Sequence, residues 1–425
     1  MKYVSFLVCI LCTLLIGCNP SKNETWNRDL ALVVPESVGI SSDRLNRIDD
    51  VINQYISENK FPGAVVQINR KGKTVFNKAY GLRDAEQNLL MNPNNIFRIA
   101  SQTKAITTVA LLTLYEEGKF LLDDPLHNYI PEFKDPNILV SLDKGSGEIV
   151  TKPAESQITI RQILTHTSGI GYGFLSPDLQ YIYEKNGVID GLTLNDETLG
   201  NVIPRLAQQP ILFEPGSQWS YGLNTDVAGY LVEVLSGQSL SDYFDEHIFR
   251  PLGMEDTYFY LPEEKADRLV PVYQSAEEGF ILTEGNGNNY PIEGSQSYYS
   301  GGGGLSSTVK DYSIFMEMLM NDGYSNGSQI LGKKTIELMI TNQIGDLKIW
   351  GGAPFGLGFR LTSEEQNHLA PGSVGIYAWG GIFNTKYWMD PKEDLSAVIM
   401  LQMYPFDHPE FHEKMQVLVY QALVD

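Results

Sequence analysis

The sequence predicts an α+β fold in which strands from both ends of the chain share one sheet and a helical lobe lies between them. Strand patterns occur near the beginning and in the last third of the chain, whereas helical patterns dominate the middle. Strands so far apart in sequence are most economically paired in a single sheet. We therefore expect a sheet lobe from about residues 36–100 and 300–425 and a helical lobe over about 101–300, with the functional site in the groove between them.

The elements of the sheet lobe follow from local periodicity. Residues 42–59 place apolar side chains at helical spacing and are followed by Pro62-Gly63, which ends the helix. The apolar runs 64–68 and 74–76 flank a turn that contains Gly72 and predict a hairpin. The other expected elements are helices from Ser101 to Gly118, over 226–235, 309–320 and about 411–423, and strands over 374–379, 385–389 and 396–401.

The composition is that of a globular protein with an acidic surface. Of the 425 residues, 43% are hydrophobic and 20% are charged, which supplies enough apolar mass for a large core. The chain has 31 basic and 52 acidic residues, so its formal net charge is −21. Such a surface repels phosphate backbones and anionic headgroups, and we expect no nucleic-acid partner.

Residues 1–17 have the pattern of an export signal. From Val4 to Ile16, 11 of 13 residues are apolar, a run shorter than the roughly 20 that span a bilayer but typical of a signal-peptide core. The run ends in Leu15-Ile16-Gly17-Cys18, which resembles a bacterial lipobox. This resemblance implies lipidation of Cys18, a polar tether over 18–35, and an exported protein held at the cell envelope by its lipid alone. The alternative is an ordinary secretory signal.

Several familiar site motifs are absent. The sequence has no His-Glu-x-x-His, CxxC, P-loop or Rossmann glycine pattern, and its six histidines show no ligand spacing. We therefore expect no metal and no cofactor. Residues 323–327 match G-x-S-x-G, but a nucleophile elbow follows a buried strand and precedes a helix. Here a helix comes first, so we predict a surface turn.

Ser-x-x-Lys, a possible nucleophile and base, occurs four times. Only Ser101 and Lys104 combine a helix start with an apolar face behind it. Residues three apart on a helix share a face, about 5–6 Å apart at Cβ, so Lys104 can reach the Ser101 hydroxyl. Free backbone N–H groups in a first turn favour a developing oxyanion. From spacing alone Ser101 is either a nucleophile or a helix cap. The other pairs lie at a helix end, in a polar loop and at an expected N-cap: Ser57/Lys60, Ser141/Lys144 and Ser307/Lys310.

Five segments support the first alternative. In chain order they are Phe97–Lys104, Leu164–Gly169, Pro215–Tyr221, Gly301–Ser307 and Trp379–Gly381. Together they resemble the serine β-lactamase and penicillin-recognising family in its class C and carboxylesterase branch, over about residues 36–405. The resemblance implies a β-lactamase/transpeptidase-like fold, with an antiparallel sheet flanked by helices and an inserted helical lobe.

The same resemblance implies a Ser-Tyr-Lys mechanism. Ser101 would be the nucleophile, and Lys104 and Tyr221 would share its proton while an acyl-enzyme forms. A lysine accepts a proton only when neutral, a form that burial between the lobes favours. The backbone N–H groups of Ser101 and Ile382 would hold the carbonyl oxygen, and Tyr221 would protonate the leaving group. His166 would support the site structurally.

Two departures from the β-lactamase pattern bear on the substrate. Where that pattern has Tyr-x-Asn, this chain has Tyr221-Gly222-Leu223, and where it has a cation and a hydroxyl, this chain has Trp379-Gly380-Gly381. We expect Leu223, Trp379, Gly380 and Gly381 to line the substrate site. Without a cation there, a substrate carboxylate would be desolvated and unpaired unless an arginine elsewhere in the groove pairs with it.

The sequence therefore favours a serine hydrolase that cleaves a small-molecule ester, neutral in charge, or a related acyl compound. One alternative is a β-lactamase or a peptidase specific for D-amino acids of the cell wall. A second alternative is an inactive binding protein on this fold, against which the joint presence of Ser101, Lys104 and Tyr221 argues.

Overall fold

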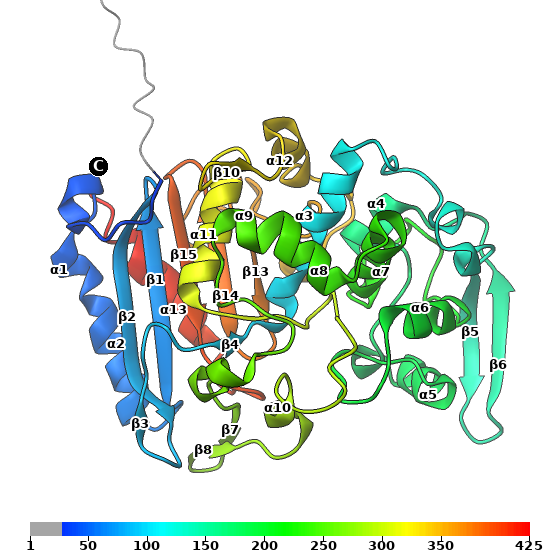
Figure 1. The fold of residues 1–425 in the computed structure, drawn as a ribbon, viewed down its shortest axis with the longest axis horizontal. Helices are drawn as coiled ribbons and strands as arrows, with labels where there is room; N and C mark the ends of the chain where they lie inside the picture. Colours follow the sequence, from blue (N-terminus) through cyan, green and yellow to red (C-terminus); the bar gives the residue numbers. More distant parts are fainter. Residues whose placement is uncertain (1–27) are drawn as a thin grey trace, which may run out of the picture.

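The computed structural model describes residues 28–425, whose centre is a seven-stranded sheet beside a mostly helical region (Figure 1). The strands follow the order β12-β13-β14-β15-β1-β2-β3, and every neighbouring pair is antiparallel. The first and last parts of the chain meet at β1 and β15, where Val65 lies opposite Met400. The predicted α+β class with an antiparallel sheet is thus confirmed. The strands are β1 (Gly63–Arg70), β2 (Lys73–Asp84), β3 (Leu89–Leu90), β12 (Arg360–Leu361), β13 (Tyr377–Gly381), β14 (Thr385–Asp390) and β15 (Leu395–Met400).

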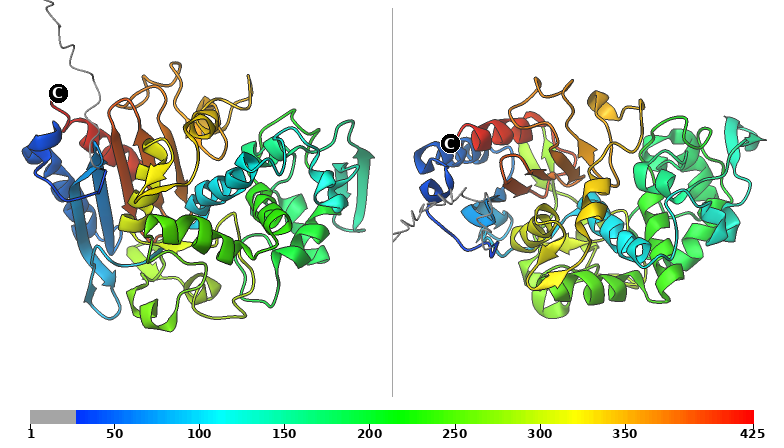
Figure 2. Two further views of the ribbon diagram at one scale, coloured as in Figure 1. Left: turned by 45° about the horizontal axis from the view of Figure 1, so that its top comes forward. Right: turned by 90° about the horizontal axis from the view of Figure 1, so that it is seen from above.

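Helices cover both faces of the sheet. Figure 2 shows α13 on one side of it and α11 on the other. Each face buries its own hydrophobic cluster, so consecutive residues of β13 divide between them: Tyr377 belongs to the cluster on the α3 and α11 side and Ala378 to the cluster on the α2 and α13 side. The helices are α1 (Ser42–Leu45), α2 (Arg47–Ser57), α3 (Thr103–Glu116), α4 (Ile160–Thr165), α5 (Pro177–Asn186), α6 (Leu199–Ala207), α7 (Asn224–Ser236), α8 (Leu240–Phe244), α9 (Arg250–Leu252), α10 (Asn286–Asn289), α11 (Val309–Met320), α12 (Lys333–Met339) and α13 (Glu410–Tyr420).

Short strand pairs lie outside the main sheet. The pair that matters for the site is β4 with β9, because β4 comes directly before Ser101. The strands of these pairs are β4 (Phe97–Arg98) with β9 (Ser306–Ser307), β5 (Asn137–Asp143) with β6 (Glu148–Pro153), β7 (Tyr273–Ala276) with β8 (Gly279–Leu282), and β10 (Tyr324–Ser325) with β11 (Ser328–Gln329).

Some expected element boundaries are corrected. The helix expected to begin at Ser101 begins at Thr103, because Ser101 lies in a 3-10 turn over Ala100–Gln102. The strand expected over 374–379 begins only at Tyr377, since Gly375 adopts a φ of +94°. The expected cap at Ser307 is wrong: Thr308 accepts the backbone N–H of Asp311 at the start of α11.

The G-x-S-x-G segment is a turn, as predicted. Tyr324 and Ser325 pair with Ser328 and Gln329 in a hairpin. Asn326 and Gly327, which connect the two strands, have φ values of +49° and +79°. Two left-handed residues in an Asn-Gly pair are typical of a tight hairpin turn, so Ser325 is not held on a nucleophile elbow.

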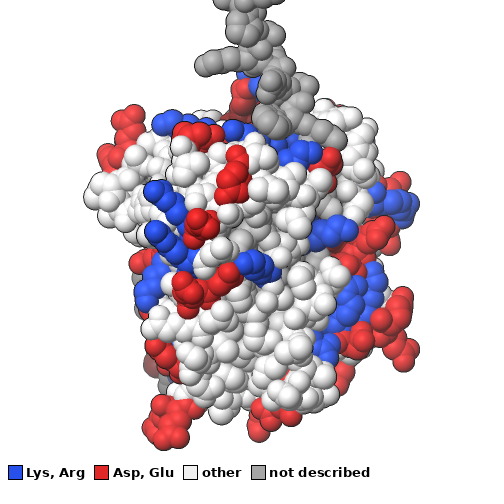
Figure 3. Space-filling model, turned by 90° about the vertical axis from the view of Figure 1, so that its left-hand side faces the viewer, with Lys and Arg blue, Asp and Glu red and all other residues white. Residues whose placement is uncertain are grey.

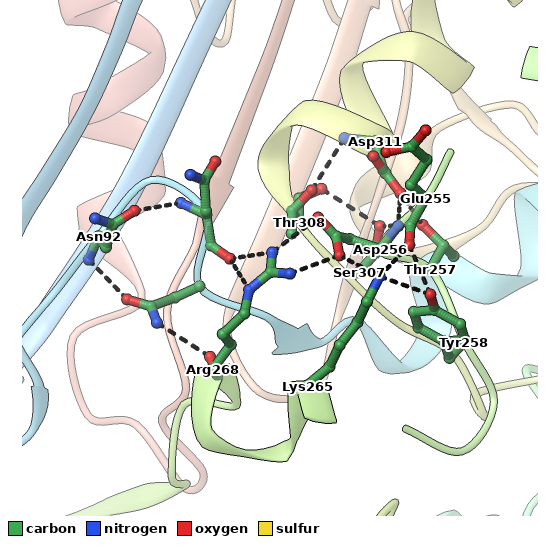
Figure 4. A network of polar contacts seen from close by, with 12 residues as sticks. Asn92, Glu255, Asp256, Thr257, Tyr258, Lys265, Arg268, Ser307, Thr308 and Asp311 are labelled. Carbon is green, nitrogen blue, oxygen red and sulfur yellow. Dashed lines mark hydrogen bonds and ion pairs between the residues drawn. The ribbon is translucent and has the colours of Figure 1, made fainter. Parts of the chain in front are cut away.

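A network of charged side chains fixes the segment beside β4 and β9 (Figure 4). Asp256 accepts hydrogen bonds from Arg268 at 2.7 and 2.8 Å and from Lys265 at 2.8 Å. Asp311 of α11 accepts the backbone N–H of Asp256 at 2.7 Å and the hydroxyl of Thr257 at 2.9 Å. These contacts tie the loop after α9 to the start of α11.

Charges of both signs are interspersed on the face formed by the β1–β2 end of the sheet (Figure 3). Ion pairs on this side include Lys78 with Asp49 and Lys73 with Asp29, both at 2.6 Å. Within residues 28–425, no helix is long and apolar enough to cross a membrane, and no group of His, Cys, Asp and Glu could hold a metal ion. The predicted signal peptide and Cys18 lie outside the described residues.

Candidate active site

Ser101 lies in a turn that is held in place by Arg98, three residues earlier. The buried Arg98 side chain donates hydrogen bonds to the carbonyls of Tyr290, Val270 and Asn288 at 2.5, 2.8 and 2.7 Å. Burial lowers the pKa of Arg98 to about 9. Between this anchor and Ser101, Ala100 adopts a φ of +44°, a left-handed conformation that costs a residue with a Cβ about 1–2 kcal/mol. Strain of this kind is concentrated at functional sites.

Lys104 reaches back from α3 to the Ser101 hydroxyl, as the spacing predicts. Its Nζ lies 3.3 Å from Ser101 Oγ, 3.0 Å from the Tyr172 hydroxyl and 2.5 Å from the Gly302 carbonyl oxygen. The side chain is buried, with 2% exposed. Three oxygen atoms therefore surround the amine in a place with little water.

Tyr221 packs against the same amine. Lys104 Nζ lies 4.6 Å from the centre of the Tyr221 ring, within the range of a cation–π contact. The Tyr221 hydroxyl accepts a hydrogen bond of 3.3 Å from the indole Nε1–H of Trp379. The structure thus brings together Ser101, Lys104, Tyr221 and Trp379, although they come from three distant parts of the sequence.

His166 lies behind Tyr221 rather than beside Ser101. Its ring centre is 4.9 Å from that of Tyr221, and Asn224 Nδ2 lies 3.1 Å from its Nδ1. Burial, together with the charge of Lys104, holds the pKa of His166 well below its ordinary value. The imidazole is therefore neutral and buttresses the tyrosine ring.

The buried carboxyl group of Asp226 lies near Lys104. Asp226 Oδ1 accepts the Ser300 hydroxyl at 2.6 Å and the Gly302 N–H at 3.2 Å, while Oδ2 has no hydrogen-bond partner among the described residues. Burial raises the pKa of Asp226, and hydrogen bonding from Ser300 and the charge of Lys104 oppose that rise. The glycine at 302 permits this approach, because a Cβ there would lie 2.3 Å from Asp226 Oδ2.

Ser101 and Tyr221 open into a cavity of 460 Å³. Trp379, Gly380 and Gly381, the third-motif residues expected to line the substrate site, line this cavity together with Ile382. Leu223 is not among the described residues that line the cavity and is 1% exposed, so its expected place in the substrate site is wrong. The complete lining is Ser101, Phe174, Leu175, Tyr221, Ile349, Trp350, Arg360, Ala378, Trp379, Gly380, Gly381, Ile382 and Lys386.

The two backbone groups expected to form an oxyanion hole lie on adjoining segments. Gly381 passes so close to the turn before Ser101 that a Cβ there would lie 2.3 Å from the Ile99 carbonyl oxygen. Among residues 28–425, no hydrogen bond occupies the N–H of Ser101 or of Ile382. Both donors are therefore free for a carbonyl oxygen.

Comparison with known proteins identifies the family. A family model described as Beta-lactamase matches residues 48–421. This chain belongs to the β-lactamase family.

Relatives within the family include esterases and acyltransferases. Esterase EstB of Burkholderia gladioli is 31% identical over 372 residues, which cover 83% of this chain and 89% of that protein. The solved structure of EstCE1, described as a hydrolase with promiscuous acyltransferase activity, has a TM-score of 0.76 at 28% identity and covers 89% of this chain and 99% of that one. Simvastatin synthase (LovD) from Aspergillus terreus shares the fold, with a TM-score of 0.76 at 24% identity over 89% and 98% of the two chains.

These similarities confirm the family, the β-lactamase/transpeptidase-like fold and an enzyme of the serine-hydrolase type. Four residues at the family's site were not predicted from the sequence. The Tyr172 hydroxyl contacts Lys104 Nζ, and Asp226 is close enough for the charge of Lys104 to affect its pKa. The cations Arg360 and Lys386 line the cavity. The sequence left open an arginine elsewhere in the groove, and the strands that flank the third motif supply Arg360 together with Lys386.

Proposed function

We propose that this protein hydrolyses ester or related acyl bonds through an acyl-enzyme on Ser101, with Lys104 and Tyr221 carrying the protons. The observation that carries the proposal is the 3.3 Å separation of Lys104 Nζ from Ser101 Oγ at the floor of the cavity. The esterase names of several relatives support the same class of reaction.

The oxygen atoms around Lys104 explain how it would act as a base. The Gly302 carbonyl can only accept a hydrogen bond, so it takes one N–H of the amine. Burial raises the pKa of the Tyr172 hydroxyl well above its ordinary value, so this group stays protonated and can accept a second N–H. The lone pair of a neutral amine then points toward the remaining neighbour, the Ser101 hydroxyl.

The surroundings of Lys104 also stabilise its protonated form once it has received the proton from Ser101. The Tyr221 ring face and the carboxylate of Asp226 both stabilise an ammonium at this position. The substrate carbonyl oxygen would accept hydrogen bonds from Ser101 N–H and Ile382 N–H, and Tyr221 would pass a proton to the leaving group. Water would then attack the acyl-enzyme and release the acid.

The internal hydrogen bonds of Asn224 disfavour recognition of a β-lactam side chain. Its amide nitrogen faces His166 and donates to the Ile170 carbonyl at 3.0 Å, while its oxygen accepts the Ser168 hydroxyl at 2.5 Å. The amide that a Tyr-x-Asn motif would offer to an acylamide is therefore engaged inside the protein. We expect esters to be much better substrates than cephalosporins.

The test compares wild type with Ser101→Ala and, as a matched control, Ser57→Ala from another Ser-x-x-Lys pair. Wild type and the control should cleave p-nitrophenyl butyrate quickly and a chromogenic cephalosporin slowly, and Ser101→Ala should lose at least about 10³-fold in kcat. Mass spectrometry after fluorophosphonate treatment should find the label on Ser101. Ester cleavage that survives Ser101→Ala would overturn the nucleophile, and efficient cephalosporin cleavage would support the β-lactamase alternative.

Transfer of the acyl group to an alcohol is a second candidate function. Four large hydrophobic residues on the cavity wall are exposed: Phe174 by 51%, Leu175 by 52%, Trp350 by 57% and Ile382 by 39%. Such a mouth can hold an apolar alcohol in place of water. With p-nitrophenyl butyrate and added 1-butanol, transfer predicts butyl butyrate and faster nitrophenol release, whereas pure hydrolysis predicts butyrate alone.

We also propose that Cys18 carries a lipid that anchors the protein at the cell envelope. The support is the lipobox-like Leu15-Ile16-Gly17-Cys18 after an apolar run. In bacterial cells fed labelled palmitate, wild type and Cys12→Ser should become labelled and stay with the membrane fraction. Cys18→Ser should do neither, and labelling of that variant would contradict the anchor.

A further inference from the structure

Two cations line the same cavity as Ser101, one on each side of the third motif. Arg360 on β12 is the register partner of Ala378, and Lys386 on β14 is the register partner of Gly380. Paired residues of neighbouring strands place their side chains on the same face, so both cations lie on the Ala378 and Gly380 face of β13. Gly380 leaves room for the lysine stem, because a Cβ at 380 would lie 3.5 Å from Lys386 Cδ.

Neither cation is paired with an acid. Among the described residues, no side-chain hydrogen bond or ion pair within 4.0 Å reaches the side chain of Arg360 or Lys386, although the chain carries 52 acidic against 31 basic residues. Both side chains are partly buried. Partly buried cations without a counter-ion cost free energy, which an anionic ligand would recover.

The residues of α13 that face Lys386 do not neutralise it. Glu413 contributes an attraction but forms no ion pair with the lysine. The ring nitrogens of His412 are buried and have no hydrogen-bond partner within residues 28–425. Burial together with the charge of Lys386 holds the pKa of His412 at about 3, so it is a neutral neighbour. Burial and the charge of Arg360 lower the pKa of Lys386 to about 8.

We propose that the natural substrate is an ester that bears a carboxylate, and that Arg360 and Lys386 bind this carboxylate while the ester carbonyl lies at Ser101. The inference rests on the proposed function and names its substrate class. From Gly381, beside the nucleophile, to Ala378, beside Arg360, the strand rises by three residues or about 10 Å. Gly380, the register partner of Lys386, lies only one residue or about 3.4 Å from Gly381, and both long cationic side chains line the same cavity as Ser101. A carboxylate a few carbon atoms away from the ester carbonyl can therefore meet these side chains, and the apolar walls Ile349 and Trp350 suit the connecting chain.

The test uses full-length protein and two pairs of esters that differ only in charge. The first pair is 4-nitrophenyl hydrogen glutarate and its methyl ester, with the charge on the acyl side. The second is 4-acetoxyphenylacetate and its methyl ester, with the charge on the alcohol side. For each pair the readout is kcat/KM for the anion divided by kcat/KM for the methyl ester.

The variants are Arg360→Gln, Lys386→Gln and the double substitution. We expect wild type to favour the anion at least tenfold in one pair, each single substitution to reduce the ratio, and the double substitution to bring it to about one or below. The control is Arg250→Gln with Lys334→Gln, which removes two cations that are 71% and 85% exposed and should leave the ratio unchanged. A preference for the methyl ester in both pairs, or an anion preference that survives the double substitution, overturns the proposal.

A binding measurement separates this proposal from the proposed function. In Ser101→Ala, calorimetric titration with intact 4-nitrophenyl hydrogen glutarate and 4-acetoxyphenylacetate should show binding of at least one, and the added Arg360→Gln and Lys386→Gln should abolish it. Such binding without any ester hydrolysis by wild type would sink the esterase function and leave the carboxylate site standing. Hydrolysis without charge preference and without this binding would overturn the carboxylate site and leave the esterase function standing.

Discussion

The indole N–H of Trp379 donates a hydrogen bond to the hydroxyl of Tyr221, with 3.3 Å between the two atoms. The third motif, which here has neither the cation nor the hydroxyl usual in β-lactamases, thus supplies a neutral donor to the tyrosine oxygen. Aromatic neighbours fix the indole: Trp350 is stacked at 6.4 Å and Phe355 meets it edge-on at 5.5 Å. This donor can stabilise negative charge on the Tyr221 oxygen as protons move.

Trp379→Phe should keep the packing and remove only the donor. We expect kcat/KM for p-nitrophenyl butyrate to fall about tenfold, or about 1.4 kcal/mol, as for a hydrogen bond to a group that becomes charged. Trp388→Phe is the matched control, because Trp388 packs on the α2 and α13 side of the sheet and does not line the cavity. Equal activity of the Trp379 variant and wild type would show that the donor has no role in the reaction.

Tyr172→Phe tests whether the hydroxyl beside Lys104 positions the base. Its loss leaves one N–H of the buried amine without an acceptor, and we expect kcat to fall between about 10- and 100-fold with the fold intact. Tyr183→Phe is the control: Tyr183 is also buried, but its hydroxyl donates to the Gly171 carbonyl at 3.2 Å rather than contacting Lys104. Should both variants lose activity equally, the loss would reflect packing and not the base.

Gly302→Ala should displace the backbone carbonyl that accepts a hydrogen bond from Lys104. The added Cβ would lie 2.3 Å from Asp226 Oδ2 and 3.1 Å from the Tyr172 hydroxyl, so the carbonyl that accepts from Lys104 must shift. We expect kcat/KM to fall at least about 100-fold and the free energy of unfolding to fall by about 1–3 kcal/mol. At Gly303 the nearest atom to an added Cβ is 3.9 Å away, so Gly303→Ala should be tolerated. Unchanged kinetics for Gly302→Ala would mean that the amine needs no fixed acceptor.

Asp311 should make stability depend on pH. Burial raises its pKa to about 6 from the ordinary 3.8, so the folded protein binds this proton more tightly than the unfolded chain does. The contribution of this group is therefore most favourable below about pH 4 and declines by about 3 kcal/mol as the pH rises through 6. Urea unfolding of wild type and Asp311→Asn should show the difference in stability shrinking or reversing, by about that amount, between about pH 4 and pH 7. A difference that is independent of pH would contradict the raised pKa.

Features set by short-range sequence were predictable. The helix expected over 309–320 is α11 with those bounds, because its apolar face and polar start are local signals. The strand expected over 385–389 extends by one residue as β14. The pairing of Ser101 with Lys104 depends on one turn of chain, and the structure places the two groups 3.3 Å apart.

Features set by tertiary register were not predictable in the same way. Arg360 reaches the cavity because β12 pairs with β13, and no local pattern predicts that register. For Lys386 the sequence did contain part of the answer. Alternation along 385–389 predicts that the Lys386 side chain lies on the same face of the sheet as Trp388 and on the opposite face from Tyr387. Tyr172 comes from an aperiodic loop between two glycines, and only the folded chain brings its hydroxyl to Lys104.

Strand β13 separates two tasks between its two faces. Gly381 adjoins the turn that carries the nucleophile, whereas Ala378 and Gly380 adjoin the strands that carry the cations. Because the two faces of the sheet are packed by separate hydrophobic clusters, substitutions beneath α13 can alter the charge around Arg360 and Lys386 while the packing behind Ser101 stays as it is. If the two cations bind the substrate as proposed, natural variation or laboratory evolution can change substrate preference through the face beneath α13 while the residues around Ser101 stay unchanged.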